Sequence, residues 1–421
     1  MKYNTVKLGE YLYIKGRIGW KGLKKNEYLP DGDYRIINGE SLTTNGIDWS
    51  KAGYITKERY NESPEIMLAP NDILISKDGT IGKIGFVKNV EKPTTVASGI
   101  FVVRNLRPAE INTRFIYHFL TSSFFKNFVV MRTEGSVIPH LYQKDFVELD
   151  FPLPKMEVQN KIVGILDSID QKIEINKEIN ENLEEQAVLL FRSWFSDFSQ
   201  SSASPRISTE FGDIPSDFSF VKVGSLPMLV TDYVANGSFA SLKENVTLYQ
   251  EPNYAYFVRN TDLKSGSFGV YVDQHSYEFL SKSTLYGGEI IISNVGDVGS
   301  VFLCPKLNGP MTLGNNIIML RPEDDTLKYY LYIWFKHLQG QALIQGIKGG
   351  SAQPKFNKTD FKNTSVILPP TDLLSRFHDT VAPMFEIINQ NHAENTNLSS
   401  LRDTLLPRLM SGELDVSKID V

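Results

Sequence analysis

Two long stretches of the chain carry apolar residues at alternating intervals of four and three, the spacing of a coiled-coil seam. In the first stretch, between Glu157 and Phe195, the seam positions are Ile162, Leu166, Ile169, Ile173, Asn176, Asn180, Leu183, Ala187, Leu190 and Trp194. In the second stretch, each position lies 215 residues later: Phe377, Val381, Met384, Ile388, Asn391, Asn395, Leu398, Arg402, Leu405 and Leu409. Each stretch therefore predicts one long amphipathic helix.

The regions before the two helices show a different pattern. Short β-rich runs bounded by Gly, Asn and Asp, such as residues 34–37 and 254–258, predict strands. An apolar strand then enters a Gly-x-x-Gly turn, at Gly79 and Gly82 in one half and at Gly296 and Gly299 in the other. Helical periodicity follows in both halves, so each half predicts an α+β globule.

The two halves are internal repeats of one another. Residues 71–82 match residues 288–299 at an offset of 217, sharing the pattern Ile-x-Ile-Ser and both glycines. Four further matches follow at an offset of 215, including Val6-Lys7-Leu8-Gly9 with Val221-Lys222-Val223-Gly224 and Gly135-Ser136 with Gly350-Ser351. Collinear matches of this kind predict a tandem duplication of globule and helix.

A helix of this length cannot bury its apolar stripe alone, so the simplest solution pairs the two copies with each other. Antiparallel packing would place Asn176 and Asn180 opposite Asn391 and Asn395 in the middle of the seam. Buried amides in a seam cost stability but fix its register, and we interpret these four residues as a register lock. The alternative is that the four side chains are simply solvated. Pro383 should kink the second helix or delay its start.

These patterns predict a fold of class α+β: a tandem, pseudo-twofold repeat of two α/β globules joined by two long antiparallel coiled-coil helices. The Ser-rich stretch 199–205 reads as the start of a linker. The expected boundaries are 1–154 for the first globule, 155–198 for the central helix, 199–210 for the linker, 211–370 for the second globule, 371–412 for the C-terminal helix and 413–421 for a tail.

Composition supports an ordinary globular protein, because 41% of the residues are hydrophobic and 22% are charged, which excludes large-scale disorder. The single cysteine, Cys304, cannot form an internal disulfide, and the first residues contain no apolar signal region. We therefore expect a cytoplasmic protein. Apolar runs also stay below the roughly 18 residues that a membrane span needs.

Enzyme motifs are missing from the sequence. Gly82-Lys83 is followed by Ile84 and lacks a phosphate-binding loop, and the one Pro-Pro pair, in residues 368–371, does not form an amino-methyltransferase tetrapeptide. The six histidines show no metal-ligand spacing, and one cysteine excludes a structural zinc cluster, so we expect no metal site. The residues themselves favour a binding protein without catalytic activity.

The net charge of −5 is unevenly distributed. Residues 1–150 hold 21 basic and 17 acidic side chains, a net charge of +4, whereas the two long helical regions 151–200 and 371–421 each carry a net charge of −4. The densest basic segment, residues 15–25, interleaves cations with glycines and an aromatic ring, which suits a loop that contacts phosphates and bases. The alternative for this segment is a solvated basic turn.

The candidate DNA-binding residues follow from this distribution. In the first globule they are Arg17, Trp20, Lys21, Lys24, Lys25, Asn38, Lys77, Ser136, His140 and Lys144. In the second globule they are Arg259, Asn260, Asn294, Ser351, Gln353, Lys355 and Lys358. Arginine, lysine, asparagine and glutamine are the side chains that contact base edges and phosphates.

The chain resembles the specificity (S) subunit of type I restriction-modification systems. The most distinctive segments are residues 16–23 (Gly-Arg-Ile-Gly-Trp-Lys-Gly-Leu), the run 72–82 and the two Gly-Ser loops. Equally distinctive are Leu153-Pro154 with Gln159 and Ile162, the run 189–195 that ends the first helix, and the run 405–414 that ends the second. The resemblance spans essentially the whole chain, although the second globule lacks an equivalent of Gly-Arg-Ile-Gly-Trp.

The resemblance implies two target-recognition domains, each reading one half of a split, asymmetric site in double-stranded DNA. It implies that the coil docks two methyltransferase subunits and, through them, restriction subunits that translocate and cut DNA. S-adenosylmethionine, Mg and ATP would then be bound by the partner subunits, with no cofactor in this chain and no membrane partner.

Two other interpretations stay open at this point. The chain could supply DNA specificity to a methylation-only or other phage-defence system without a nuclease. It could also be a coiled-coil scaffold whose globules bind protein or glycan, although the basic loop and the resemblance weigh against this.

Overall fold

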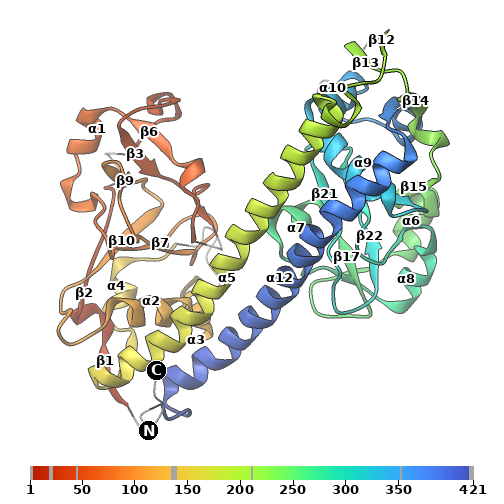
Figure 1. Cartoon of the computed structure of the whole chain (residues 1–421). Coiled ribbons are helices and arrows are strands. Elements are labelled where there is room, and N and C mark those ends of the chain that lie inside the picture. The colour runs from red at the N-terminus through yellow and green to blue at the C-terminus, as the bar shows by residue number, and fades with distance from the viewer. Residues whose placement is uncertain are drawn as a thin grey trace. The chain divides into compact units, whose positions relative to one another are not determined.

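The computed structural model describes residues 3–18, 22–43, 46–133, 140–209, 212–350 and 353–416. The chain divides into two compact units: Met1–Ile173 with Thr396–Val421 form unit 1, and Glu174–Asn395 form unit 2 (Figure 1). The boundary cuts both long helices, so each unit contains a globule together with one end of each helix. In each unit, helix and globule share a hydrophobic core.

Unit 1 is built on a four-stranded antiparallel sheet. Its strand order is β2 (Leu12–Gly16), β10 (Ile100–Asn105), β7 (Ile73–Ser76) and β8 (Ile84–Phe86). A second sheet has the order β6 (Gly53–Ile55), β3 (Tyr34–Ile37) and β9 (Thr94–Val96), and two short pairs join β1 (Asn4–Lys7) to β11 (Asp150–Leu153) and β4 (Leu42–Thr43) to β5 (Gly46–Ile47). Strands β7 and β10 are almost entirely buried, as their unbroken apolar runs predict.

Most helical segments of unit 1 share a core with one face of this sheet, whereas the short helix Lys57–Asn61 packs at the second sheet, where Tyr60 contacts Tyr34 of β3. The helices of this unit are α1 (Lys57–Asn61), α2 (Thr113–Thr121), α3 (Ser123–Thr133), α4 (Gln143–Val147), the first part of α5 (Met156–Phe191) and the last part of α12 (Thr371–Ser411). Phe115, Phe119 and Leu120 of α2 are buried, as their helical spacing predicts. Asn112 caps α2, because its side chain accepts hydrogen bonds from the backbone N–H groups of Arg114 and Phe115.

Unit 2 contains a four-stranded sheet in the order β15 (Met228–Asp232), β23 (Ile317–Pro322), β20 (Ile290–Ser293) and β21 (Val301–Leu303). A five-stranded sheet has the order β16 (Leu248–Tyr249), β18 (Tyr271–Val272), β17 (Ala255–Val258), β22 (Met311–Leu313) and β19 (Thr284–Leu285). The remaining pairs are β12 (Arg206–Thr209) with β13 (Gly212–Pro215) and β14 (Ser219–Lys222) with β24 (Ser365–Leu368). The helices are α6 (Phe239–Asn245), α7 (Asn260–Ser265), α8 (Gln274–Phe279), α9 (Thr326–Lys336), α10 (Leu338–Gly346) and α11 (Lys358–Asn363).

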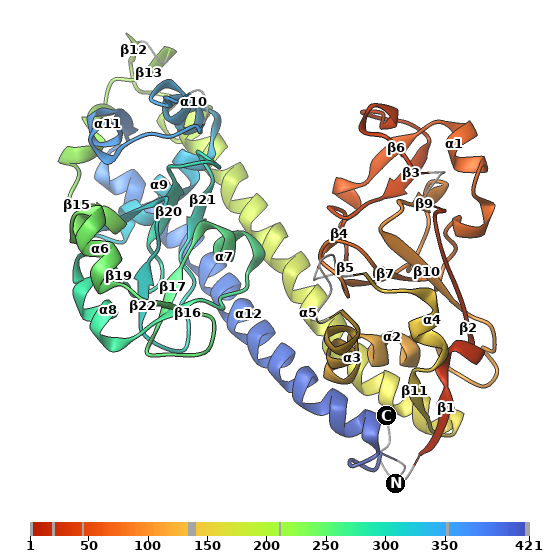
Figure 2. The same cartoon turned by 180° about the vertical axis from the view of Figure 1, so that it is seen from behind.

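Helix α9 packs on the four-stranded sheet of unit 2 beside β20 and β21 (Figure 2). Tyr330, Trp334 and Phe335 of this helix are buried, as expected. Tyr330 donates a hydrogen bond to the carbonyl of Ile367 at 2.5 Å, so the ring fills the core while its hydroxyl stays satisfied.

Corresponding elements occur in the same order in the two units. The β2-β10-β7-β8 and β15-β23-β20-β21 sheets have the same strand order. The second sheet of each unit contains one parallel pair, β3 with β9 in unit 1 and β17 with β22 in unit 2. Helices α5 and α12 begin at Met156 and Thr371, which are 215 residues apart. The spacing that repeats in the sequence is thus also the spacing of the elements.

The two long helices run antiparallel within each unit. In unit 1, Ile162 and Leu166 of α5 share a core with Leu406 and Leu409 of α12. In unit 2, Ala187 and Phe191 near the end of α5 pack in the same core as Phe377 and Val381 near the start of α12. The start of α5 therefore packs beside the end of α12, and the end of α5 packs beside the start of α12.

Several expected boundaries need correction. Helix α5 ends at Phe191 and continues as one π-helical turn, Arg192–Ser196, and β12 occupies the end of the expected linker. The expected tail is anchored in unit 1, because Val416 is buried and the N–H of Leu414 bonds the carbonyl of Arg408.

Helix α12 begins at Thr371 and passes Pro383 without interruption, so Pro383 does not delay its start. Buried Val381 and Phe385 on either side hold the helix to the core of unit 2.

A search of the described ranges for a helix long and apolar enough to cross a membrane finds none.

Candidate nucleic-acid interface

The basic segment of unit 1 separates into a buried and an exposed part. Lys15 lies near the end of β2, and Arg17 follows that strand directly. Lys24 and Lys25 are exposed at the short 3-10 helix Lys25–Glu27, where the backbone N–H of Lys24 bonds a carboxylate oxygen of Glu27 at 2.7 Å. Trp20 and Lys21 lie outside the described residues. Exposed Lys24 and Lys25 remain candidates for contacts with phosphates.

Arg17 points into the protein, so its assignment as a direct DNA contact stays a prediction that its burial does not support. The side chain is 2% exposed, and its guanidinium donates to the carbonyl of Val96 at 3.1 Å and to the hydroxyl groups of Ser63 and Thr95. Burial lowers the pKa of Arg17, with the charge of Arg59 adding to the effect. In this structure Arg17 ties β2 to the strand β9 and to the turn at Ser63.

A cavity of about 430 Å³ opens next to Arg17 at the end of β2. Its walls are formed by Lys15, Gly16, Arg17, Ile18, Glu65, Lys77, Phe101 and Gln143. The ammonium nitrogen of Lys77 lies 4.9 Å from the centre of the Phe101 ring. Lys77 was expected as a DNA-binding residue, whereas Lys15 and Gln143 were not, although Lys15 belongs to the same basic segment.

The other candidates in unit 1 fall into two groups. Asn38 is used in a tight turn, because its side-chain oxygen accepts hydrogen bonds from the backbone N–H groups of Glu40 and Ser41. His140 pairs with Asp78 and lies 4.5 Å from the ring of Tyr142, over which the ammonium group of Lys144 sits at 5.4 Å. Ser136 lies outside the described residues. His140 and Lys144 thus belong to one surface patch at the start of α4.

In unit 2, most candidate cations already have acidic partners. Arg259 forms two hydrogen bonds to the carboxylate of Asp262, at 2.6 and 2.9 Å, and Lys358 pairs with Asp232 at 2.9 Å. Asn260 donates to Asp297 at 3.3 Å. The hydrogen bonds to Asp262 raise the pKa of Arg259 above its usual value, against the effect of burial.

The remaining candidates of unit 2 are Asn294 and the residues around position 355. The amide of Asn294 donates to the carbonyl of Phe356 at 3.2 Å, while Gln353 and Lys355 are exposed. Ser351 lies outside the described residues. Of the candidate cations of unit 2, Arg259 and Lys358 are therefore less available to an outside anion than Lys355.

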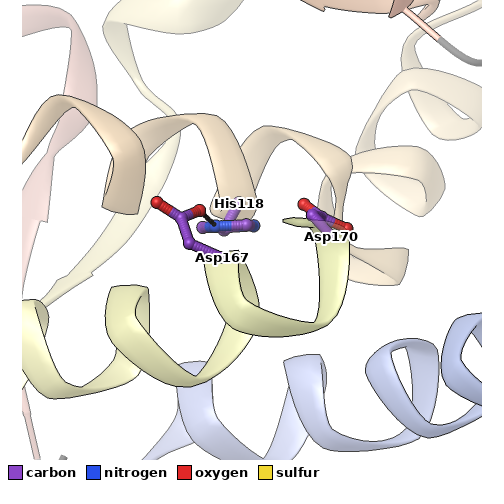
Figure 3. Close-up of side chains that lie close together, drawn as sticks. All are labelled: His118, Asp167 and Asp170. Carbon is purple, nitrogen blue, oxygen red and sulfur yellow. Dashed lines mark hydrogen bonds and ion pairs between the residues drawn. The ribbon is translucent and has the colours of Figure 1, made fainter. Parts of the chain in front are cut away.

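One titratable cluster was not expected from the sequence. His118 of α2 and Asp167 and Asp170 of α5 lie close together in unit 1 (Figure 3). The His118 ring nitrogen Nε2 lies 2.7 Å from Asp167, and Arg114 binds both oxygens of the same carboxylate. Arg402 of α12 bonds Asp170 at 3.0 Å.

The donors around this cluster act as its counter-ions. Burial opposes ionisation of Asp167, but the hydrogen bonds and charges of His118 and Arg114 outweigh it and lower the pKa of Asp167 to about 2. The two arginines supply the positive charge that a cation would otherwise bring, so the arrangement is that of an ion-pair network joining α2, α5 and α12. His118 and Arg114 are spaced by four on one face of α2, but nothing in the sequence pairs them with α5.

The four asparagines of the seam meet within unit 2. The amide of Asn176 donates to Glu394 at 2.7 Å and to Asn395 at 2.9 Å, and that of Asn391 donates to Asn180 at 2.7 Å. Asn176 is fully buried and Asn180 nearly so. These are hydrogen bonds between helices at the positions where antiparallel packing would place them.

Comparison with known proteins connects this geometry to a family. A family model described as "Type I restriction modification DNA specificity domain" matches residues 2–185 and 230–390. The type I restriction enzyme MjaIX specificity subunit of Methanocaldococcus jannaschii is 27% identical over 381 residues, which cover 87% of this chain and 82% of that protein. The EcoKI specificity subunit of Escherichia coli K12 is 23% identical over 415 residues, which cover 93% of this chain and 83% of that protein.

A solved structure shares the fold. The S subunit of a type I restriction-modification system from M. genitalium aligns with a TM-score of 0.53 at 18% identity, covering 97% of this chain and 96% of that chain. At this identity the likeness concerns the arrangement of helices and strands.

Proposed function

The chain belongs to the type I restriction modification DNA specificity family, and we propose from this that it is the subunit that selects a bipartite, asymmetric DNA site for a type I restriction-modification complex. Unit 1 and unit 2 each read one half of that site. The chain has no catalytic role of its own. Adenine methylation and DNA cleavage belong to partner subunits, which bind S-adenosylmethionine, Mg and ATP.

The observation that carries this proposal is that one family model matches the chain twice, over residues 2–185 and 230–390. A site split into two half-sites requires two recognition domains, one for each half. The shared connectivity of the β2-β10-β7-β8 and β15-β23-β20-β21 sheets supports it, because two scaffolds of one design can hold different loops against two different half-sites.

The two long helices act as the spacer and as the docking site for two methyltransferase subunits, and restriction subunits attach through these. A continuous helix such as α5, which spans Met156–Phe191, sets a fixed separation between the segments that it connects. Two weak half-site interactions then add through effective concentration, so that the pair is more selective than either alone. The tandem pseudo-twofold arrangement of the fold is part of this proposal.

Contacts with the DNA backbone and contacts with the bases have different roles. Exposed cations such as Lys24, Lys25 and Lys144 position the phosphate backbone, while a small number of polar side chains choose the bases. The net charge of +4 in residues 1–150 favours unit 1 for phosphate contacts.

Methylome sequencing tests the proposal. Cells with and without the gene for this chain are compared, and we expect the loss of methylated adenines from one two-part motif with a fixed spacer. Swapping residues 22–153 for those of a relative should change one half of the motif and leave the other half intact. Unchanged methylation on deletion of the gene would contradict the proposed function. Restriction of unmodified phage then separates a complete system from a methylation-only one.

A further inference from the structure

The cavity at the end of β2 corresponds to an edge of unit 2 that carries an ion pair. Strand pairing aligns the two places: Gly16 lies opposite Phe101 in the β2–β10 pair, and Asp232 lies opposite Ile318 in the β15–β23 pair. Helices α4 and α11 approach the same edge in each unit and begin with Gln143 and Lys358, which are 215 residues apart.

In unit 2, charged groups of opposite sign fill this edge. Asp232 carries a carboxylate where unit 1 has a glycine, and Lys358 binds it at 2.9 Å. The side chain of Asp232 also accepts a hydrogen bond from the backbone N–H of Ala235. The two charges of this pair therefore neutralise each other.

In unit 1, the same edge is open and cationic. Gly16 has no side chain, and a Cβ atom placed there would approach the Lys77 ammonium to 3.4 Å and the carbonyl oxygen of Ile100 to 3.1 Å. Lys15, Arg17 and Lys77 line the cavity with Glu65 as the acidic group, an excess of two positive charges. Among the described residues, the ammonium groups of Lys15 and Lys77 form no hydrogen bond or ion pair.

The surroundings hold Lys77 in place for an incoming anion. Its backbone N–H bonds the carbonyl of Gly99 and its carbonyl accepts from the N–H of Leu141, so the backbone is fixed on both sides. The ammonium rests over the face of Phe101, where a cation gains from the ring but keeps its N–H donors for another partner. In a nucleic-acid reader, a phosphate oxygen is the ligand expected for lysines that line one cavity.

We propose that this cavity is a phosphate-binding site of unit 1, in which Lys15 and Lys77 hold one backbone phosphate of the DNA, and that unit 2 lacks the equivalent site because the Asp232–Lys358 pair fills it. The two units then differ in how they use the same scaffold. Unit 1 anchors the backbone at this edge, and unit 2 depends on contacts elsewhere. This inference rests on the proposed function, since it assumes that the bound phosphate belongs to DNA.

Lysine footprinting tests the site directly. The full chain is acetylated alone, with a duplex that carries the methylated motif, with a scrambled duplex and with inorganic phosphate, and the modified lysines are quantified by mass spectrometry. We expect both duplexes to protect Lys15 and Lys77, while Lys126, an exposed lysine on α3, stays reactive. Protection by inorganic phosphate but by neither duplex would overturn the assignment to DNA.

The salt dependence of binding supplies a second readout. Replacing both Lys15 and Lys77 by alanine should reduce the slope of log K against log salt by about one, the value for a single lost phosphate contact, whereas Lys126→Ala should leave it unchanged. Asp232→Asn keeps the Oδ1 acceptor that Ala235 and Lys358 share but removes the negative charge that neutralises Lys358, and we expect it to increase the slope.

The outcomes separate the two proposals. Duplex binding without protection of Lys15 and Lys77, together with an unchanged slope in the double variant, would overturn the phosphate site and leave the proposed function standing. An unchanged slope in Asp232→Asn would overturn the explanation given for unit 2. Failure of every duplex to bind, together with an unaltered methylome, would overturn both proposals.

Discussion

At the scale of single residues, a network of ion pairs surrounds Asp167. Arg114 and His118 of α2 bind its carboxylate, and the neighbouring Asp170 bonds Arg402 of α12. Because three helices meet there, the network fixes how the long helices leave the globule of unit 1. Unit 2 makes the corresponding junction differently: the rings of Tyr329 and Phe385 stack with their centres 4.4 Å apart.

Asp167→Asn should lower the free energy of unfolding by about 2 kcal/mol at neutral pH, since the variant loses a carboxylate whose pKa is about 2 in the folded chain and about 3.9 when unfolded. A depressed pKa stabilises the folded state above the unfolded value. The difference between the two proteins should therefore shrink as pH falls from about 4 to about 2. Urea unfolding at several pH values measures this. Asp379→Asn, at a largely exposed aspartate outside the network, is the control and should have little effect. A constant difference across that pH range would contradict the assignment.

Arg17→Met tests whether Arg17 is structural. The variant keeps much of the side-chain length but leaves the carbonyl of Val96 without its buried donor, so we expect a loss of about 1–3 kcal/mol in the free energy of unfolding. Lys25→Met, at an exposed position in the same segment, should leave stability almost unchanged. Thermal unfolding followed by circular dichroism is the measurement. Unchanged stability together with weakened DNA binding would instead restore Arg17 as a DNA contact.

The candidate residues were only partly predictable. Composition points to a cationic first globule. Sequence alone cannot tell that Arg17 turns inward while Lys77 lines a cavity, because the residues that surround each side chain come from distant parts of the chain. The acidic partners of Arg259 and Lys358 differ in their distance along the sequence, and so in how easily they could be predicted. Asp262 lies three residues from Arg259 and could have been suspected, whereas Asp232 lies 126 residues from Lys358.

At the scale of elements, the long helices and the buried strands were predictable because their patterns are local and repeated. Residues 34–37 form β3, and the seam positions Ile162 and Leu166 are buried in α5. The sheet order was not predictable, since parallel pairs such as β17 with β22 join strands about fifty residues apart in sequence. Nor did the pattern reveal the β12–β13 hairpin, whose strands are short and mostly exposed.

The four asparagines of the seam allow a prediction for the helix pair. Replacing Asn176, Asn180, Asn391 and Asn395 by leucine should stabilise the pairing but permit more than one register, because the hydrogen bonds that single out one alignment are lost. Cysteines introduced on α5 and α12 within unit 2 report the register by crosslinking. We expect crosslinks from one alignment in the parent and from several in the variant. Crosslinks from a single alignment in both would show that the asparagines do not set the register.

At the scale of the whole molecule, the proposed function makes helix length a determinant of DNA specificity. Insertion of one heptad at matching positions of α5 and α12 keeps the apolar seam in phase and lengthens each helix by about 10 Å. At about 3.4 Å per base pair, we expect the recognised spacer to grow by about three base pairs while both half-site sequences stay the same. A heptad inserted in α5 alone is the matched control, because it leaves the seam without a partner and should abolish methylation of the site. Methylome sequencing of both variants reads spacer and half-sites together. An unchanged spacer in the doubly lengthened protein would mean that the helices do not set the distance between the half-sites.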